Sequence, residues 1–195
     1  MTVNTVALFL ALLAVVAELG AAAVAGAWLL HRARSGSTAW RQWIVAGFGP
    51  SAFPLAAVVA GVSMAGSLYF SEVANFVPCS LCWYQRIAMY SLAVLLGLAA
   101  VRRDSGIRPY AMVLAALGLA ISTYHVMVER FPNLESGVCS ATAPCTVIWV
   151  KELGYLTIPT MAWSGFAAIL ALLATDGAHR AVDTGARDVS QEARS

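Results

Sequence analysis

Five long apolar runs, separated by short polar segments, decide what this chain can fold into. Hydrophobic residues make up 60% of the 195 residues and charged residues only 11%, whereas a soluble domain carries roughly 25% charge. Each run is long enough to cross a bilayer as a helix at ~1.5 Å rise per residue. The pattern predicts an all-α integral membrane protein. The net charge of +2 gives no indication of nucleic-acid binding.

The expected membrane spans are residues 6–30, 52–70, 83–101, 110–128 and 159–175. The first run does not read as a signal peptide, because it lacks a basic start and its basic residues follow it. Residues 31–48 hold arginines and aromatic residues, so we expect an interfacial segment there. Residues 147–156 mix apolar and charged positions and predict a surface helix. The polar tail from residue 176 onward is expected to be disordered.

The arginines predict an orientation. Arg32, Arg34 and Arg41 lie in the loop between the first and second spans, and Arg102, Arg103 and Arg108 lie in the loop between the third and fourth. Two spans separate these loops, so they lie on the same side of the membrane. The positive-inside rule places both loops in the cytoplasm, with the amino terminus outside. The start of the third span and the loop after the fourth then face an oxidising compartment.

The four cysteines form two local pairs, Cys79 with Cys82 and Cys139 with Cys145. One pair lies where a polar loop meets the third span, and the other lies in the loop after the fourth span. With this topology both pairs share the outward face, close enough to the membrane surface for thiol–disulfide exchange. In that reaction a thiolate attacks a disulfide and a second thiol resolves the mixed disulfide. All four cysteines are therefore candidate catalytic residues.

A Cys-x-x-Cys pair is weak evidence alone, and two alternatives remain. The four thiols can together hold zinc, or they can form two static disulfides. Five residues separate Cys139 from Cys145, which is looser than the usual zinc spacing. An outward face is also a poor place to keep four thiols reduced. We therefore favour redox exchange and expect no metal.

Cys82 is expected at the amino end of the third helix, where unsatisfied N–H groups and the helix dipole favour a thiolate. Arg86 follows at i+4 on the same face. It can stabilise that thiolate or the oxyanion of a reduced ligand. The alternative is an arginine that snorkels to the headgroups, and the spacing to Cys82 favours the functional interpretation.

Two electrons from an external dithiol need an acceptor, and the sequence carries no haem, flavin or nucleotide motif. A lipid-soluble quinone is the natural candidate, docked where the third span meets the outer interface. Trp83 and Tyr84 are expected to line its pocket. His125 can hydrogen-bond a quinone oxygen or move a proton, unless it is a satisfied interfacial histidine. Glu129, at i+4, either orients His125 or is an exposed acid.

Glu18 lies near the middle of the first span. An ionisable residue there is a functional candidate. We favour the alternative that it faces a neighbouring helix, protonated or hydrogen-bonded.

Residues 67–72 (SLYFSE), 78–86 (PCSLCWYQR), 124–125 (YH) and 158–160 (IPT) resemble the bacterial disulfide bond formation protein B family, including its BdbC-type members. The resemblance covers about residues 52–175. It implies a four-helix membrane bundle in the bacterial plasma membrane. It also implies quinone-dependent reoxidation, with ubiquinone or menaquinone, of an extracytoplasmic thioredoxin-fold thiol oxidase of the DsbA type.

The resemblance also implies roles for the cysteines. Cys139 accepts the attack of the partner's thiol, and Cys145 relays to Cys79. Cys82 is the thiolate that contacts the quinone, supported by Arg86. The close spacing of the second pair, as in BdbC-type members, leaves the order of exchange open.

With this resemblance the chain divides into an N-terminal helix with a basic interfacial segment (residues 1–48), a four-helix membrane domain (49–175) and a cytoplasmic tail (176–195). The first span lies outside the family core and has no assigned function. Two other functions stay open: a quinone-linked reductase resembling the vitamin K epoxide reductases, and a non-enzymatic membrane scaffold stapled by disulfides.

Overall fold

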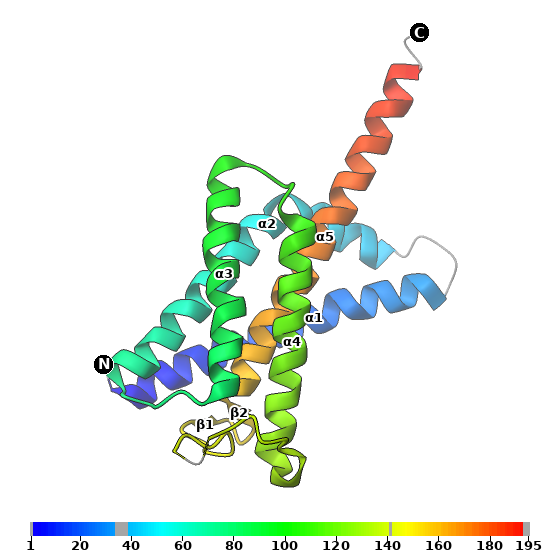
Figure 1. The fold of residues 1–195 in the computed structure, drawn as a ribbon. Helices are drawn as coiled ribbons and strands as arrows, with labels where there is room; N and C mark the ends of the chain where they lie inside the picture. The colour runs from blue at the N-terminus through cyan, green and yellow to red at the C-terminus, as the bar shows by residue number, and fades with distance from the viewer. Residues whose placement is uncertain (1, 34–38, 141, 193–195) are drawn as a thin grey trace.

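The computed structural model describes residues 2–33, 39–140 and 142–192. Its main elements are the helices α1 (Val3–Ala33), α2 (Ala39–Leu68), α3 (Ser80–Arg102), α4 (Arg108–Arg130) and α5 (Ile158–Glu192) (Figure 1). A π-helix (Tyr69–Val73) continues α2, and a 3-10 helix (Pro132–Leu134) follows α4. Strands β1 (Lys151–Glu152) and β2 (Leu156–Thr157) pair antiparallel. By length and composition five helices of the described chain can cross a membrane, so the predicted helical membrane fold is confirmed.

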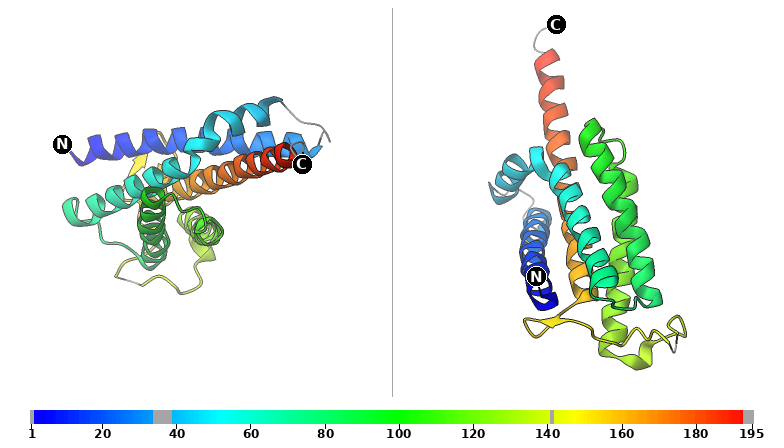
Figure 2. Two further views of the ribbon diagram at one scale, coloured as in Figure 1. Left: turned by 90° about the horizontal axis from the view of Figure 1, so that it is seen from above. Right: turned by 90° about the vertical axis from the view of Figure 1, so that its left-hand side faces the viewer.

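Helices α1, α2 and α5 run side by side, and α3 and α4 pack against them (Figure 2). The core between α2, α3, α4 and α5 combines large side chains with small ones: Leu92, Leu96, Phe166, Ile169, Leu173, Ala56, Ala60, Ala111 and Ala115. A Cβ at Gly118 of α4 would overlap the ring of Phe166, so a glycine is needed for the close approach of α4 and α5. Small residues of this kind drive helix association in lipid, because they let backbones approach closely.

Helix α2 differs from the expected pattern. The segment predicted as interfacial and the second span form one helix from Ala39, with Pro50 and Pro54 inside it. The domain boundary placed after residue 48 therefore falls within α2, and residues 34–38 lie outside the described structure. Proline is tolerated inside membrane helices because neighbouring groups satisfy the freed carbonyls.

The prediction of a disordered tail is wrong for residues 176–192, which continue α5. Asp176 is buried and accepts hydrogen bonds from Arg180 Nε at 2.9 and 3.1 Å, one helical turn later. The ring of His179 packs where a Cβ at Gly49 would lie. Contacts with α2 thus prolong a helix that composition alone does not favour.

The expected surface helix at residues 147–156 is also replaced, by the hairpin of β1 and β2. Leu153 and Gly154 have positive φ values of 50° and 83° and reverse the chain. Leu156 is fully buried against Ala11 and Ala14 of α1. Glu18 accepts hydrogen bonds from Tyr155 Oη and Ser164 Oγ, both at 2.8 Å. The interpretation that Glu18 is hydrogen-bonded to its neighbours is confirmed.

Candidate active site

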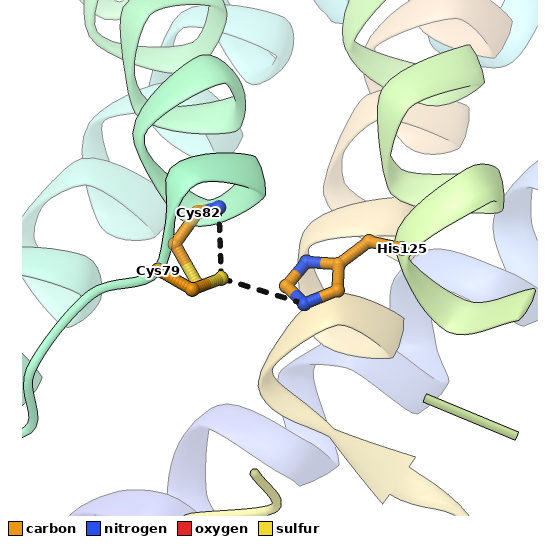
Figure 3. Close-up of side chains that lie close together, drawn as sticks. All are labelled: Cys79, Cys82 and His125. Carbon is orange, nitrogen blue, oxygen red and sulfur yellow. Dashed lines mark hydrogen bonds between the residues drawn. The ribbon is translucent and has the colours of Figure 1, made fainter. Parts of the chain in front are cut away.

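Cys79 is the N-cap of α3. Its backbone is extended (φ −75°, ψ 173°), and its Sγ accepts the backbone N–H of Cys82 at 3.3 Å. The Sγ atoms of the two residues lie 2.9 Å apart, and both cysteines are free (Figure 3). The first turn of a helix presents unpaired N–H groups and a positive dipole end. The thiol pair therefore lies where a sulfur anion is stabilised.

The pKa of Cys79 is lowered from 9.0 to about 4. The hydrogen bond with the Cys82 side chain is the largest cause, burial opposes it, and His125 lowers the pKa further. The thiolate of the reduced pair is therefore Cys79, whereas the sequence led us to expect Cys82. The reason is the start of the helix: Cys79 occupies the cap, and the Cys82 N–H and thiol approach its sulfur.

His125 joins the cysteine pair to a second helix. It is buried in α4, and its Nε2 lies 3.7 Å from Cys79 Sγ and 3.2 Å from the carbonyl oxygen of Cys145. Its Nδ1 lies 2.9 Å from Nε2 of the buried Gln85 amide. Because an amide nitrogen donates, Nδ1 accepts and Nε2 carries the proton. The histidine N–H is therefore directed between the Cys79 sulfur and the Cys145 carbonyl.

Gln85 was not singled out by sequence reasoning. Its signal was present: an amide inside an apolar span, three positions after Cys82 and thus on the same helix face. Glu129, for which an orienting role and an exposed position were both open, accepts a hydrogen bond from Thr157 Oγ1 at 2.7 Å. Gln85 therefore has the orienting position.

The two cysteine pairs meet in one cluster. Cys139 and Cys145 form a disulfide with a Cα–Cα distance of 5.8 Å. Cys79 and Cys145 are buried in the same group of side chains, with Cys82 and Cys139 partly buried against them. A cavity of about 30 Å³, enough for roughly one water, is lined by Cys79, His125 and Cys145. Residues 60 positions apart in sequence thus share one site.

The disulfide bears on the zinc alternative. With Cys139 and Cys145 bonded to each other, the four thiols are not available together. A different donor set is present, since the ligand atoms of Cys79, Cys82 and His125 lie within 4.8 Å of one another and could hold a metal ion.

Two contacts position the Arg86 side chain. Its Nη2 donates to the carbonyl oxygen of Ser67 at 3.0 Å, and its guanidinium lies 5.3 Å from the centre of the Trp83 ring. Tyr90 Oη donates to Ser67 Oγ at 3.2 Å. Ser67 lies at the end of α2, just before the π-helix, and π-turns are frequent at functional sites.

Cys82 and Arg86 open onto a large groove of about 620 Å³. Most of its polar lining is at this end, from Ser67, Cys82, Gln85, Arg86 and Tyr90. Trp83, Tyr84 and His125 do not line it, contrary to expectation. Positions one and two after Cys82 point to other faces of the helix, while positions three and four share its face. Trp83 and Tyr84 are about half exposed, and His125 lines the small cavity with Cys79 and Cys145 instead.

Comparison with known proteins identifies the family of this chain. The family model for the disulfide bond formation protein DsbB matches residues 49–176. The chain belongs to the DsbB family. This membership implies a role in membrane thiol–disulfide oxidation. No solved structure matches the chain.

Similar proteins are named as disulfide formation proteins. The probable disulfide formation protein of Oceanobacillus iheyensis is 43% identical over 117 residues, which cover 59% of this chain and 81% of that protein. Disulfide bond formation protein C of Bacillus subtilis (strain 168) is 41% identical over 115 residues, covering 58% of this chain and 83% of the relative. In both, the chain is similar over most of the relative's length.

Proposed function

We propose that this protein is a quinone-dependent protein-dithiol oxidoreductase. It takes two electrons from a reduced extracytoplasmic thioredoxin-fold protein of the DsbA type and passes them to ubiquinone or menaquinone in the membrane. One observation carries the proposal. Nε2 of His125 lies close to both the Cys79 sulfur and the Cys145 carbonyl oxygen, while Cys82 and Arg86 line an apolar groove. The four cysteines thus connect an aqueous loop with a lipid-facing site.

The first exchange takes place at the loop disulfide. Cys145 is buried and Cys139 is only partly buried, so a partner's thiolate attacks Cys139. The Cys139–Cys145 bond breaks, a mixed disulfide forms, and Cys145 leaves as the thiolate. The partner's second thiol then attacks the mixed disulfide. The partner leaves oxidised, and Cys139 and Cys145 hold the two electrons.

The second exchange passes these electrons to the pair at α3. Cys145 attacks Cys79 of a Cys79–Cys82 disulfide, and Cys82 leaves. Cys139 then attacks Cys145, which restores the loop disulfide and releases Cys79 as a thiolate. A thiol of low pKa is a fast leaving group, and the His125 N–H stabilises the charge that develops on Cys79. The products are a loop disulfide and two free thiols, the arrangement in the structure.

The groove fits a quinone in chemistry and position. When bound, a quinone supplies a two-electron, two-proton acceptor that leaves as the quinol. Cys82 lies at the polar end of the groove, and Arg86 presents a positive charge one turn along the same face. The Ser67 carbonyl and the Trp83 ring fix that guanidinium, so it is oriented before a ligand binds. When Cys79 and Cys82 give up their electrons they reform their disulfide, and the cycle closes.

The proposed setting is the bacterial plasma membrane, crossed several times, with the cysteines on the extracytoplasmic side. The loop between α3 and α4, flanked by Arg102 and Arg108, is at the opposite end of the bundle from the cysteine loop (Figure 1). The positive-inside rule places such a loop in the cytoplasm.

The test is anaerobic quinone reduction, followed by absorbance, with a reduced thioredoxin-fold protein as the only donor. The wild-type protein is expected to turn over, and each of Cys79→Ser, Cys82→Ser, Cys139→Ser and Cys145→Ser to lose turnover. Full turnover in any of these variants contradicts the proposed electron path. Reduction of a quinone epoxide in place of quinone reduction would move the protein to the class that resembles the vitamin K epoxide reductases.

A further inference from the structure

The groove at Cys82 is not built by the family region alone. Much of its wall comes from α1 and the start of α2, which precede the matched residues 49–176. The α1 contribution includes Leu13, Ala14, Ala17, Gly20, Ala21 and Val24. The start of α2 adds Trp40, Trp43 and Phe48. Helix α1 packs mainly on α5 and lies beside it in both views of Figure 2, so it covers a side that a four-helix core alone would leave open.

The α1 side of the groove is lined largely by small side chains, which leave room between the helices. Ala14, Ala17 and Ala21 recur at three- and four-residue intervals, so they share one face of α1. Across the groove, α2 presents Val58 and Val62. The stretch of α1 from residue 10 to residue 24 lines the groove, and at ~1.5 Å rise per residue it covers ~21 Å, most of a bilayer's hydrocarbon thickness. The groove is therefore long and lined mostly by apolar side chains, and its polar side chains lie mainly at the Cys82 end.

Helix α1 is held in this position by polar contacts. Glu18 accepts hydrogen bonds from Ser164 Oγ on α5 and from Tyr155 Oη in the hairpin, both at 2.8 Å. Leu156 of β2 packs fully buried on Ala11 and Ala14. Hydrogen bonds between helices contribute to association within a membrane. The Glu18 carboxylate thus fixes α1 against α5 and the hairpin, a role separate from the chemistry of the cysteines.

We propose that α1 is part of the acceptor site: its small-residue face holds the polyisoprenoid tail of a quinone whose head lies at Cys82 and Arg86, and Glu18 is the positioning residue that fixes this wall. The inference rests on the proposed function. A linear apolar tail fits a groove of this length, and continuity with the redox-active end selects a quinone over an unrelated lipid.

The first test is photolabelling. A long-tailed quinone with a diazirine near the tail end is bound to the full-length protein in nanodiscs, illuminated, and the labelled peptides are mapped by mass spectrometry. Label is expected in residues 10–24 and 40–48 and is expected to fall at least fivefold in Ala17→Trp, which fills the groove. Ala22→Trp is the matched control, because Ala22 is exposed and lies outside the lining. Label confined to other segments, or equal label in both variants, overturns the inference.

The second test uses tail length. The ratio of KM for a long-tailed quinone to KM for a tail-less one is expected to rise at least tenfold in Ala17→Trp and to stay within twofold of wild type in Ala22→Trp. Glu18→Leu is expected to lower photolabelling of α1, and Glu18→Gln, which keeps an acceptor oxygen, to restore it. An unchanged ratio in Ala17→Trp overturns the inference while leaving quinone reduction intact. Absence of any quinone reduction by wild type would instead refute the proposed function.

A membrane phospholipid is the competing occupant. Nanodiscs containing a phospholipid with a diazirine-bearing acyl chain distinguish the two. If that lipid labels residues 10–24 and excess long-tailed quinone does not displace the label, the groove is a lipid site and the inference is refuted. Displacement by long-tailed but not by tail-less quinone supports it.

Discussion

Cys79 Sγ lies 3.7 Å from Nε2 of His125, so a thiol that caps α3 meets an imidazole buried in α4. The same Nε2 is 3.2 Å from the carbonyl oxygen of Cys145. One N–H group thereby links the thiol pair of the third helix with the disulfide of the loop.

The first prediction concerns pH. The pKa of Cys79 is lowered to about 4, so its thiolate persists from alkaline pH down to about pH 5 and disappears as the pH falls through about 4. The stability that the thiolate contributes is present above the unfolded pKa of 9.0 and is lost in that same acidic range. The alkylation rate of the reduced protein, with the site identified by mass spectrometry, is expected to be flat between pH 6 and 9. A midpoint near pH 9 would show that the site does not stabilise the anion.

The second prediction concerns Gln85. Gln85→Leu removes the donor that fixes the His125 tautomer, at a cost of about one hydrogen bond. The transfer of electrons between the two cysteine pairs is expected to slow about tenfold, measured by quenched-flow alkylation of the reduced loop pair. Tyr84→Phe is the control, since Tyr84 is about half exposed beside Gln85. Equal rates in Gln85→Leu and wild type would remove Gln85 from the mechanism.

The third prediction separates the two ends of the site. Arg86→Ala is expected to raise the quinone KM by roughly ten- to a hundredfold, the range for a hydrogen bond to a charged group. Exchange between the cysteine pairs is expected to be unaffected. Arg86→Lys keeps the charge but loses the planar contact with Trp83. Its quinone KM is expected to lie between those of the wild type and Arg86→Ala. Unchanged quinone kinetics in Arg86→Ala would refute its role.

The fourth prediction tests helix packing. Gly118→Ala places a methyl group against the Phe166 ring and must push α4 from α5. Overpacking of this kind costs about 1–3 kcal/mol, so the thermal unfolding temperature in detergent is expected to fall by several degrees. Gly97→Ala is the matched control, because a Cβ at Gly97 meets nothing within 4 Å. Similar unfolding temperatures for the two variants would contradict the packing of α4 on α5.

Much of this arrangement could be predicted from sequence, because long apolar runs have few solutions in a bilayer. The five spans follow from that, and the local pairing of the cysteines follows from their spacing. What failed depended on tertiary contacts. Within residues 176–192, which continue α5, Asp176 is buried and bonded to Arg180 one turn later, and His179 packs at Gly49 of α2. Residues 151–157 form a hairpin whose Leu156 is buried against α1.

In the site, too, some features could be predicted from the sequence and others depend on tertiary contacts. The spacing of Cys82 and Arg86 placed both on one helix face, and both line the groove. Which sulfur caps the helix depends on the residue at which α3 begins. The helix begins at Ser80, earlier than the expected residue 83, so the cap and the thiolate are at Cys79 and not at Cys82. The contact between Gln85 of α3 and His125 of α4 joins residues 40 positions apart, and spacing within one helix does not reveal it.

The electron path is tested most directly by trapping its central bond. In a Cys82→Ala, Cys139→Ala double variant the remaining thiols are Cys79 and Cys145, which pack in one cluster beside His125. Under mild oxidation they are expected to form an intramolecular disulfide in nearly all molecules, detected by mass spectrometry of the cross-linked peptides. Failure of Cys79 and Cys145 to cross-link, with both thiols still open to alkylation, would contradict the relay.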